Sequence, residues 1–187
     1  TQAIRHLAER NIPICYFSSG GWFSAITMGM GHKNVELRRA QYRAAFDPER
    51  CLVLSRRLVK AKIINSRTFL RRNARELDDA VLKELKRLAQ SVEQAGALDS
   101  LLGLEGMAAR IYLQNFRHGI KNAPFLSGGF DSESRNRRPP RDPLNALLSY
   151  VYSLLVKELT VICTMMGFDA YQGFYHQPRY GKPALAL

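Results

Sequence analysis

The stretch that decides the fold is DPLNALLSYVYSLLVKELTVICTMMG, residues Asp142–Gly167. Asp142 is suited to cap a helix whose first residue is Pro143, and Gly167 is suited to end it. Between them, apolar residues recur at the spacing of one helix face: Leu144, Leu147, Leu148, Val151, Leu155, Leu159 and Ile162. The sequence therefore predicts a long helix here, in a mostly helical domain.

Upstream of this helix, the pattern predicts four more helices. The expected helices are Val35–Phe46, Pro48–Arg72, Glu76–Gln94 and Leu98–Arg117. A turn at Asp47-Pro48 separates the first two. A loop rich in Gly, Pro and Ser is expected at Asn122–Ser134, before the last helix.

The first 32 residues have a different character. After the end of a helix at Thr1–Arg10, the segments Ile12–Phe17 and Trp22–Thr27 are predicted to be two strands of a hairpin. Two strands do not fold alone, so we expect residues 1–32 to be the C-terminal part of a β-domain plus a linker. Residues 33–187 would form a helical catalytic domain, incomplete at its C-terminus. The predicted fold class is α+β, within a longer protein.

Composition restricts the class of protein. The chain has 187 residues and a net charge of +12, which favours a polyanionic partner such as nucleic acid. Cys15, Cys51 and Cys163 form no CxxC pair, which indicates reduced thiols of a cytoplasmic protein. The apolar run Ala146–Val156 is by itself too short to cross a membrane.

The positive charge is concentrated in two places. Between Lys33 and Arg75, thirteen Lys and Arg residues face only three Asp and Glu residues. The second cluster surrounds Pro139-Pro140. A solvated basic face is the plainer interpretation, but an excess this rich in Arg favours phosphate binding. The candidate DNA-binding residues from the two clusters are Arg56, Arg57, Lys60, Arg137, Arg138 and Arg141, with Arg135 beside them.

A carboxylate, Glu105, falls on an apolar helix face. Leu101, Glu105, Ala108 and Tyr112 share that face of the helix Leu98–Arg117. A carboxylate there has to be paired, protonated or bound to a metal ion. Pattern alone favours a structural ion pair, with a catalytic or metal-binding role as the alternative.

The last segment, GFDAYQGFYHQPRYGKPALAL (Gly167–Leu187), contains His176 among aromatic residues, with Arg179 and Lys182 nearby. The segment is too aromatic for a solvated linker and too rich in Gly and Pro for a helix. It is therefore predicted to be a rigid, partly buried loop that presents an imidazole and two cations. A histidine among aromatics is more often a hydrogen-bonded core residue, yet these cations favour a phosphate-handling site.

Three segments in the observed order resemble one family. They are LLGLEGMAARIYLQNF (Leu101–Phe116), RNRRPPRDPLNALLSYVYSLL (Arg135–Leu155) and the segment Gly167–Leu187. The chain resembles, from about Ile12 to its end, the CRISPR-associated spacer-acquisition integrase, the DNA-integrating subunit of CRISPR adaptation. A match of three segments is more specific than one short motif.

The resemblance implies a divalent metal ion, Mg²⁺ or Mn²⁺, bound by Glu105 and His176 as catalytic residues and by an acidic residue after Leu187. It implies that the 3′-hydroxyl of a short foreign DNA attacks a phosphodiester at the edge of the CRISPR repeat. Arg179 and Lys182, and with them the Arg137, Arg138 and Arg141 cluster, would then neutralise phosphate oxygens. Asn145 would either help to position the site or only form a hydrogen bond at the start of the helix.

The resemblance also implies partners. Members of this family act on double-stranded DNA as homodimers, bridged by a small ferredoxin-like adaptation protein. Some are fused upstream to another nuclease or to a reverse transcriptase. Two other functions stay open from the residues: a metal-dependent nuclease acting on branched or single-stranded DNA, and a non-catalytic helical DNA-binding scaffold.

Overall fold

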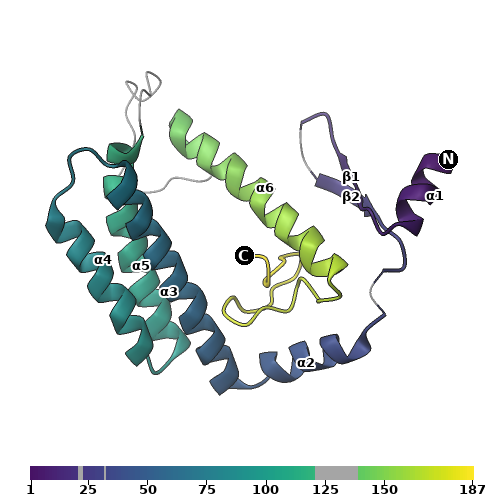
Figure 1. Cartoon of the computed structure of the whole chain (residues 1–187), viewed down its shortest axis with the longest axis horizontal. Helices are drawn as coiled ribbons and strands as arrows, with labels where there is room; N and C mark the ends of the chain where they lie inside the picture. The colour runs from purple at the N-terminus through teal and green to yellow at the C-terminus, as the bar shows by residue number, and fades with distance from the viewer. Residues whose placement is uncertain (21–22, 32, 121–138) are drawn as a thin grey trace. The chain divides into compact units, whose positions relative to one another are not determined.

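The computed structural model describes residues 1–20, 23–31, 33–120 and 139–187, and it is an α+β fold (Figure 1). Its elements lie close to the predicted ones, while the expected loop Asn122–Ser134 lies outside the described residues. In chain order they are α1 (Gln2–Glu9), β1 (Ile14–Phe17), β2 (Phe23–Thr27), α2 (Val35–Ala45), α3 (Pro48–Asn73), α4 (Asp79–Ser91), η1 (Val92–Gln94), α5 (Leu98–Asn115), η2 (Phe116–Gly119) and α6 (Pro143–Met165).

The chain divides into two compact units. One comprises Thr1–Pro48 together with Ser153–Leu187, and the other comprises Glu49–Tyr152. Helix α6 therefore contributes its first half to the second unit and its second half to the first. The boundary predicted after residue 32 separates a β-domain from a helical domain and does not coincide with the limits of these units. It stays a prediction.

The unit Glu49–Tyr152 is built on three helices, α3, α4 and α5, that lie side by side (Figure 1). Helix α3 buries Cys51, Ser55, Val59 and Ile63 at intervals of four residues, so a single face of it enters the core. From α4, η1 and α5 come the fully buried residues Leu85, Leu88, Val92 and Leu101. This unit therefore contains most of the buried apolar side chains among the described residues.

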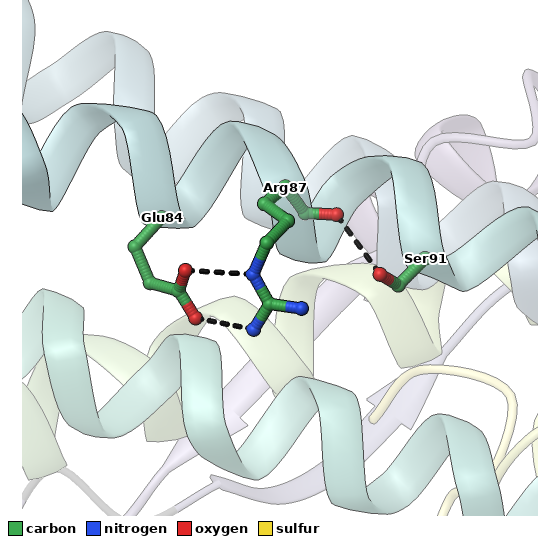
Figure 2. Close-up of polar contacts among 3 residues, drawn as sticks. All are labelled: Glu84, Arg87 and Ser91. Atoms are coloured by element: carbon green, nitrogen blue, oxygen red, sulfur yellow. Dashed lines mark hydrogen bonds and ion pairs between the residues drawn. The ribbon is translucent and has the colours of Figure 1, made fainter.

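Helix α4 starts three residues later than the sequence pattern predicted, because Asp78 caps it. The Asp78 carboxylate accepts a hydrogen bond from the backbone N–H of Ala80 at 2.8 Å. On the exposed face of α4, Arg87 donates two hydrogen bonds to Glu84, and its own carbonyl accepts one from Ser91 (Figure 2). The Arg87 guanidinium lowers the pKa of the Glu84 carboxyl. A surface pair of this kind adds little stability.

An aromatic cluster closes one end of the same unit. The Phe69 ring stacks on Phe116 at 5.3 Å between centroids, and Tyr112 meets both rings edge-on. Gly119 has to be a glycine here, because a Cβ atom would lie 2.6 Å from the Phe69 ring. Burial of the Tyr112 hydroxyl, with the nearby Tyr152, raises the Tyr112 pKa to about 12.

The other unit contains the predicted hairpin, which follows α1. Strands β1 and β2 pair antiparallel, with Ile14 opposite Thr27 and a register shift at Tyr16/Phe17. The ammonium group of Lys157, from α6, lies 4.8 Å from the centre of the Phe17 ring. This cation–π contact joins the hairpin to the second half of α6.

Helix α6 begins and ends as the sequence predicts. The Asp142 carboxylate accepts from the backbone N–H of Asn145 at 2.8 Å, and Gly167 adopts a positive φ of 92°. By length and composition this 23-residue helix is able to cross a membrane. The prediction that the apolar segment is too short to cross a membrane considered only Ala146–Val156, and the complete helix is longer. A core helix of a soluble protein passes the same test, so a single such helix is weak evidence for a membrane.

The raised pKa of Tyr112 predicts how stability falls in alkali. Above pH 10 the unfolded chain loses the tyrosine proton first, so the free energy of unfolding falls until the pH passes about 12. Tyr112→Phe should flatten this part of the profile, measured by urea unfolding between pH 9 and about 12. Tyr150→Phe, at a ring that is 56% exposed, is the control and should keep the wild-type slope. An unchanged slope in Tyr112→Phe would contradict the assignment.

Candidate functional site

The loop that contains His176 is attached to α2 by one buried side chain. Gln41, 3% exposed, donates from Nε2 to the carbonyl oxygens of Asp169 and Gln172, both at 2.8 Å. Its Oε1 accepts from the backbone N–H of Asp169 at 2.9 Å. The amide thus satisfies three backbone groups that no helix or strand would satisfy. It holds the start of the loop against α2.

Two neighbours of Gln41 on the same face of α2 extend this attachment. Arg38 donates from Nε to the carbonyl of Gly167 at 3.0 Å. The Tyr42 hydroxyl donates to the carboxylate of Asp169. That hydrogen bond, with burial and the carboxylate charge, raises the pKa of Tyr42. Residues 38, 41 and 42 follow helical spacing, so a single helix face holds the segment between Gly167 and Gln172.

Beyond this attachment the loop packs on itself. A Cβ atom at Gly173 would lie 2.7 Å from the carbonyl oxygens of both His176 and Ala184, so only glycine allows this approach. The backbone N–H of Leu185 donates to the Ala170 carbonyl at 3.0 Å. His176 is half-buried, with its ring centre 5.0 Å from that of Tyr175. The loop is thus closely packed around Gly173, while its rigidity stays a prediction.

The two cations of this loop flank a tight turn. Arg179 and Lys182 pair as opposite residues of an antiparallel bridge, and the Lys182 N–H donates to the Arg179 carbonyl at 3.0 Å. Gly181 has a φ of +70°, as a turn of type II requires at this position. Both cations are exposed, and Tyr180 between them is fully exposed.

Glu105 lies in the other unit, on α5. Leu101 and Ala108 on the same face are buried, and the Glu105 side chain is only 15% exposed, as the pattern predicted. Its carboxylate forms an ion pair with Lys62 of α3. A carboxylate with so little exposure needs a cation nearby, and Lys62 supplies one. The structural alternative thus accounts for this geometry, while the metal-binding role stays a prediction.

The two glycines beside Glu105 on α5 face open space. A Cβ atom at Gly103 or Gly106 would meet nothing within 4 Å among the described residues. Across residues 1–20, 23–31, 33–120 and 139–187, no three His, Cys, Asp or Glu side chains gather closely enough to hold a metal ion.

The basic face of α3 is divided between structural and exposed cations. Arg56 donates from Nε and Nη2 to the carbonyl of Ala95, at 3.0 and 2.6 Å. Lys60 pairs with Glu93, whose pKa the ammonium group lowers. Arg57 is exposed. All three stay candidate DNA-binding residues, and Arg56 also has a structural use.

The second basic cluster lies mostly outside the described residues, which include neither Arg135, Arg137 nor Arg138. Arg141 is exposed, just before α6. Asn145 is fully buried, and its Nδ2 donates to the Asp142 carboxylate at 2.7 Å. This hydrogen bond at the helix start is the plainer of the two roles considered for Asn145. Its Oδ1 has no hydrogen-bond partner among the described residues.

Sequence reasoning missed the side chains of α2 that hold the loop. Arg38 lies in the basic stretch Lys33–Arg75, for which phosphate binding was predicted, whereas Gln41 and Tyr42 were not singled out. The available signal was weak: Gln41 is a polar residue on the inward face of an otherwise basic amphipathic helix. Its partners lie 128 and 131 positions further along the chain, a pairing that no local pattern reveals.

Comparison with known proteins identifies the family. The family model described as "CRISPR associated protein Cas1" matches residues 1–187. The chain belongs to the Cas1 family. This bears out the resemblance drawn from the three sequence segments.

Individual Cas1 relatives agree with this assignment. A Cas4 exonuclease/Cas1 endonuclease fusion of Geobacter sulfurreducens is 48% identical over all of this chain, which covers 34% of the relative. A Cas1 endonuclease of Thermus thermophilus is 39% identical over 98% of this chain and 52% of its own length. A solved "Partial Cas6-RT-Cas1--Cas2 complex" contains a chain with a TM-score of 0.76 and 29% identity, over 99% of this chain and 55% of that one. The chain thus spans a third to a half of its Cas1 relatives.

The structural role of Arg56 in this Cas1 chain predicts a stability effect. Arg56→Gln should lower the free energy of unfolding by about 2 kcal/mol, because the buried Ala95 carbonyl loses a charged donor. Urea unfolding followed by helical circular dichroism measures this change. Arg57→Gln, at the exposed neighbour, is the matched control and should stay within about 0.5 kcal/mol of wild type. Equal effects of the two substitutions would show that the Arg56 contact adds no stability.

The contacts of Gln41 predict an effect on the histidine loop. Gln41→Met keeps the side-chain length but loses three hydrogen bonds, so amide hydrogen exchange in residues 168–187 should accelerate at least about 10-fold. Mass spectrometry of peptides from this segment gives the rate. Gln90→Met, at an exposed position of α4, should leave it unchanged. Exchange at the wild-type rate in Gln41→Met would mean that the loop keeps its structure without the Gln41 hydrogen bonds.

Proposed function

We propose that the protein containing this chain is a metal-dependent DNA integrase and endonuclease of CRISPR adaptation. It would insert short foreign DNA into the CRISPR array through attack of a 3′-hydroxyl on a phosphodiester of the repeat. The observation that carries the proposal is the match of the Cas1 family model to the entire chain, including Glu105 and His176. The names of the relatives, which describe endonucleases, support it.

Glu105 and His176 are the residues that would hold Mg²⁺ or Mn²⁺, together with the acidic ligand expected after Leu187. The donor types fit, because Mg²⁺ prefers carboxylate oxygen and Mn²⁺ also accepts imidazole nitrogen. The low exposure of Glu105 fits as well, since its carboxylate already needs a cation at close range. A bound divalent ion would polarise the phosphate under attack and stabilise the charge on the entering and leaving oxygens.

The chain's own residues would supply the remaining electrostatics. Lys62, as the partner of Glu105, would add positive charge beside the carboxylate. Arg179 and Lys182 would neutralise non-bridging phosphate oxygens from the exposed turn. In the reaction, the attacking 3′-oxygen loses its proton and bonds to phosphorus. The phosphorus–oxygen bond of the repeat strand breaks, and its 3′-oxygen takes up a proton.

The partners proposed are double-stranded DNA, namely the foreign fragment and the repeat, a second copy of the chain, and a ferredoxin-like adaptation protein. The net charge of +12 supports the DNA partner. Solved complexes whose names contain Cas1 and Cas2 support an adaptation partner. Relatives fused to Cas4, and complexes that include a reverse transcriptase, support an upstream fusion.

A second candidate function, a non-catalytic helical DNA-binding scaffold, is favoured by the ion pair between Lys62 and Glu105. In that case the carboxylate serves packing between α3 and α5, and His176 serves the loop. The two functions differ in whether DNA joining needs these two side chains.

Strand transfer by the complete protein with its adaptation partner tests the proposal. A labelled duplex with a 3′-hydroxyl end should be joined to a repeat-containing plasmid in Mn²⁺ or Mg²⁺, and not in chelator. Glu105→Ala and His176→Ala should each reduce joining about 100-fold or more, because each would remove a metal ligand. Glu84→Ala, a carboxylate on the exposed face of α4, is the control and should join DNA normally.

The outcomes separate the candidates. Loss of joining in both variants, with DNA binding retained, supports the integrase and its two ligands. Normal joining in both variants would show that the site lies elsewhere. Tight DNA binding without joining by the wild type, under any metal condition, would favour the scaffold.

A further inference from the structure

The ion pair between Lys62 and Glu105 joins two side chains in very different surroundings. The Glu105 side chain is only 15% exposed, whereas the Lys62 side chain is 59% exposed. The carboxylate is therefore held in place by the packing around α5, while most of the flexible lysine stem lies in water. Lys62 is the partner that can leave the pair without disturbing the packing of the helices.

The surroundings of Glu105 explain why a cation is kept beside it. Leu101 and Ala108, on the same face of α5, are buried. A carboxylate among apolar side chains is costly unless a positive charge lies close to it. Lys62 supplies such a charge from α3, the helix beside α5 (Figure 1). A divalent metal ion would meet the same need with twice the charge.

We infer that Lys62 is a positioning residue that holds the Glu105 carboxylate while no divalent ion is bound, and that it leaves the carboxylate when Mg²⁺ or Mn²⁺ binds. This inference rests on the metal site of the proposed function. It adds a competition within the chain, in which the lysine stabilises the metal-free site and weakens metal binding. Both effects have one origin, because the free energy of the ion pair is gained only in the absence of the metal ion.

The two cations exclude one another for an electrostatic reason. A carboxylate has two oxygens and could in principle accept an ammonium group on one and a metal ion on the other. The two cations would then lie close together, and their repulsion is about twice that of two unit charges at the same separation. The low exposure of Glu105 limits the screening of this repulsion by water and salt. Lys62 can relieve it by turning toward solvent, within the reach of one side chain from α3.

A second ion pair of α3 shows what distinguishes this one. Lys60 pairs with Glu93, but the Glu93 side chain is 57% exposed. An exposed carboxylate is well hydrated without a partner, so its ion pair contributes little. Lys60 therefore offers the matched control, since its replacement removes the same charge from the same helix without affecting a poorly hydrated carboxylate.

Binding of Mn²⁺ to the complete protein, without DNA, tests the inference by electron paramagnetic resonance of the free ion. Glu105→Ala identifies the binding that belongs to this site, because it removes the carboxylate. Lys62→Met should bind Mn²⁺ there about 5-fold more tightly than wild type, since the metal ion no longer displaces an ammonium group. Lys62→Arg keeps the charge and should bind no more tightly than wild type. Lys60→Met should stay within about 2-fold of wild type.

Thermal unfolding supplies a second readout, which a purely structural ion pair would not produce. In chelator, Lys62→Met should unfold at a lower temperature than wild type, because the Glu105 carboxylate loses a cation. In saturating Mn²⁺ this difference should close, since the ion pair is then absent from both proteins. An ion pair with only a structural role would cost the same in both conditions.

Three results would overturn the inference. They are Mn²⁺ binding in Lys62→Met that is unchanged or weaker, equal tightening in Lys60→Met, which would reflect net charge alone, and an unfolding difference that persists in Mn²⁺. Failure of the proposed function has another signature. Mn²⁺ binding would then be the same in wild type, Lys62→Met and Glu105→Ala, because Glu105 would hold no metal ion in any of them.

Discussion

The buried amide of Gln41 is the contact on which the arrangement of the histidine loop depends. A loop has no repeating backbone hydrogen bonds, and each buried N–H or C=O group left without a partner costs free energy. Gln41 satisfies three such groups in the segment Asp169–Gln172 with one side chain. A glutamine is suited to this because its amide both donates and accepts. The part of the loop after Gln172 is then stabilised by close backbone packing at Gly173.

The positive charge of this Cas1-family chain has two distinct uses. Arg38 and Arg56 donate to backbone carbonyls, and so hold the loop to α2 and the end of η1 to α3. Arg57, Arg179 and Lys182 are exposed and available to phosphate. Arginine serves both uses because its guanidinium keeps its charge and has several donors in a fixed plane. A basic sequence segment is therefore not by itself a map of a DNA-binding surface.

The elements of the fold were largely predictable, because the signals for them are local. The capping of α6 by Asp142, its end at Gly167 and the hairpin β1–β2 all follow from residues adjacent in the chain. The candidate site was predictable only in part. Periodicity placed Glu105 on a buried face, but the choice of Lys62 as its partner depends on how α3 packs on α5, 43 positions away. No pattern in one helix contains that information.

By itself, the sequence determined the helices, the basic character of the chain and, through three segments, its family. It also determined that Gly167–Leu187 is a loop, since Gly and Pro are both unfavourable in the interior of a helix. Tertiary structure alone decided which polar side chains became supports and which stayed exposed. Gln41, on a helix far from the loop in the chain, is buried against it, while Tyr180, in the middle of an aromatic segment, is fully in water. Burial depends on which surfaces meet after folding, and the contacts of Gln41 join residues 128 and 131 positions apart.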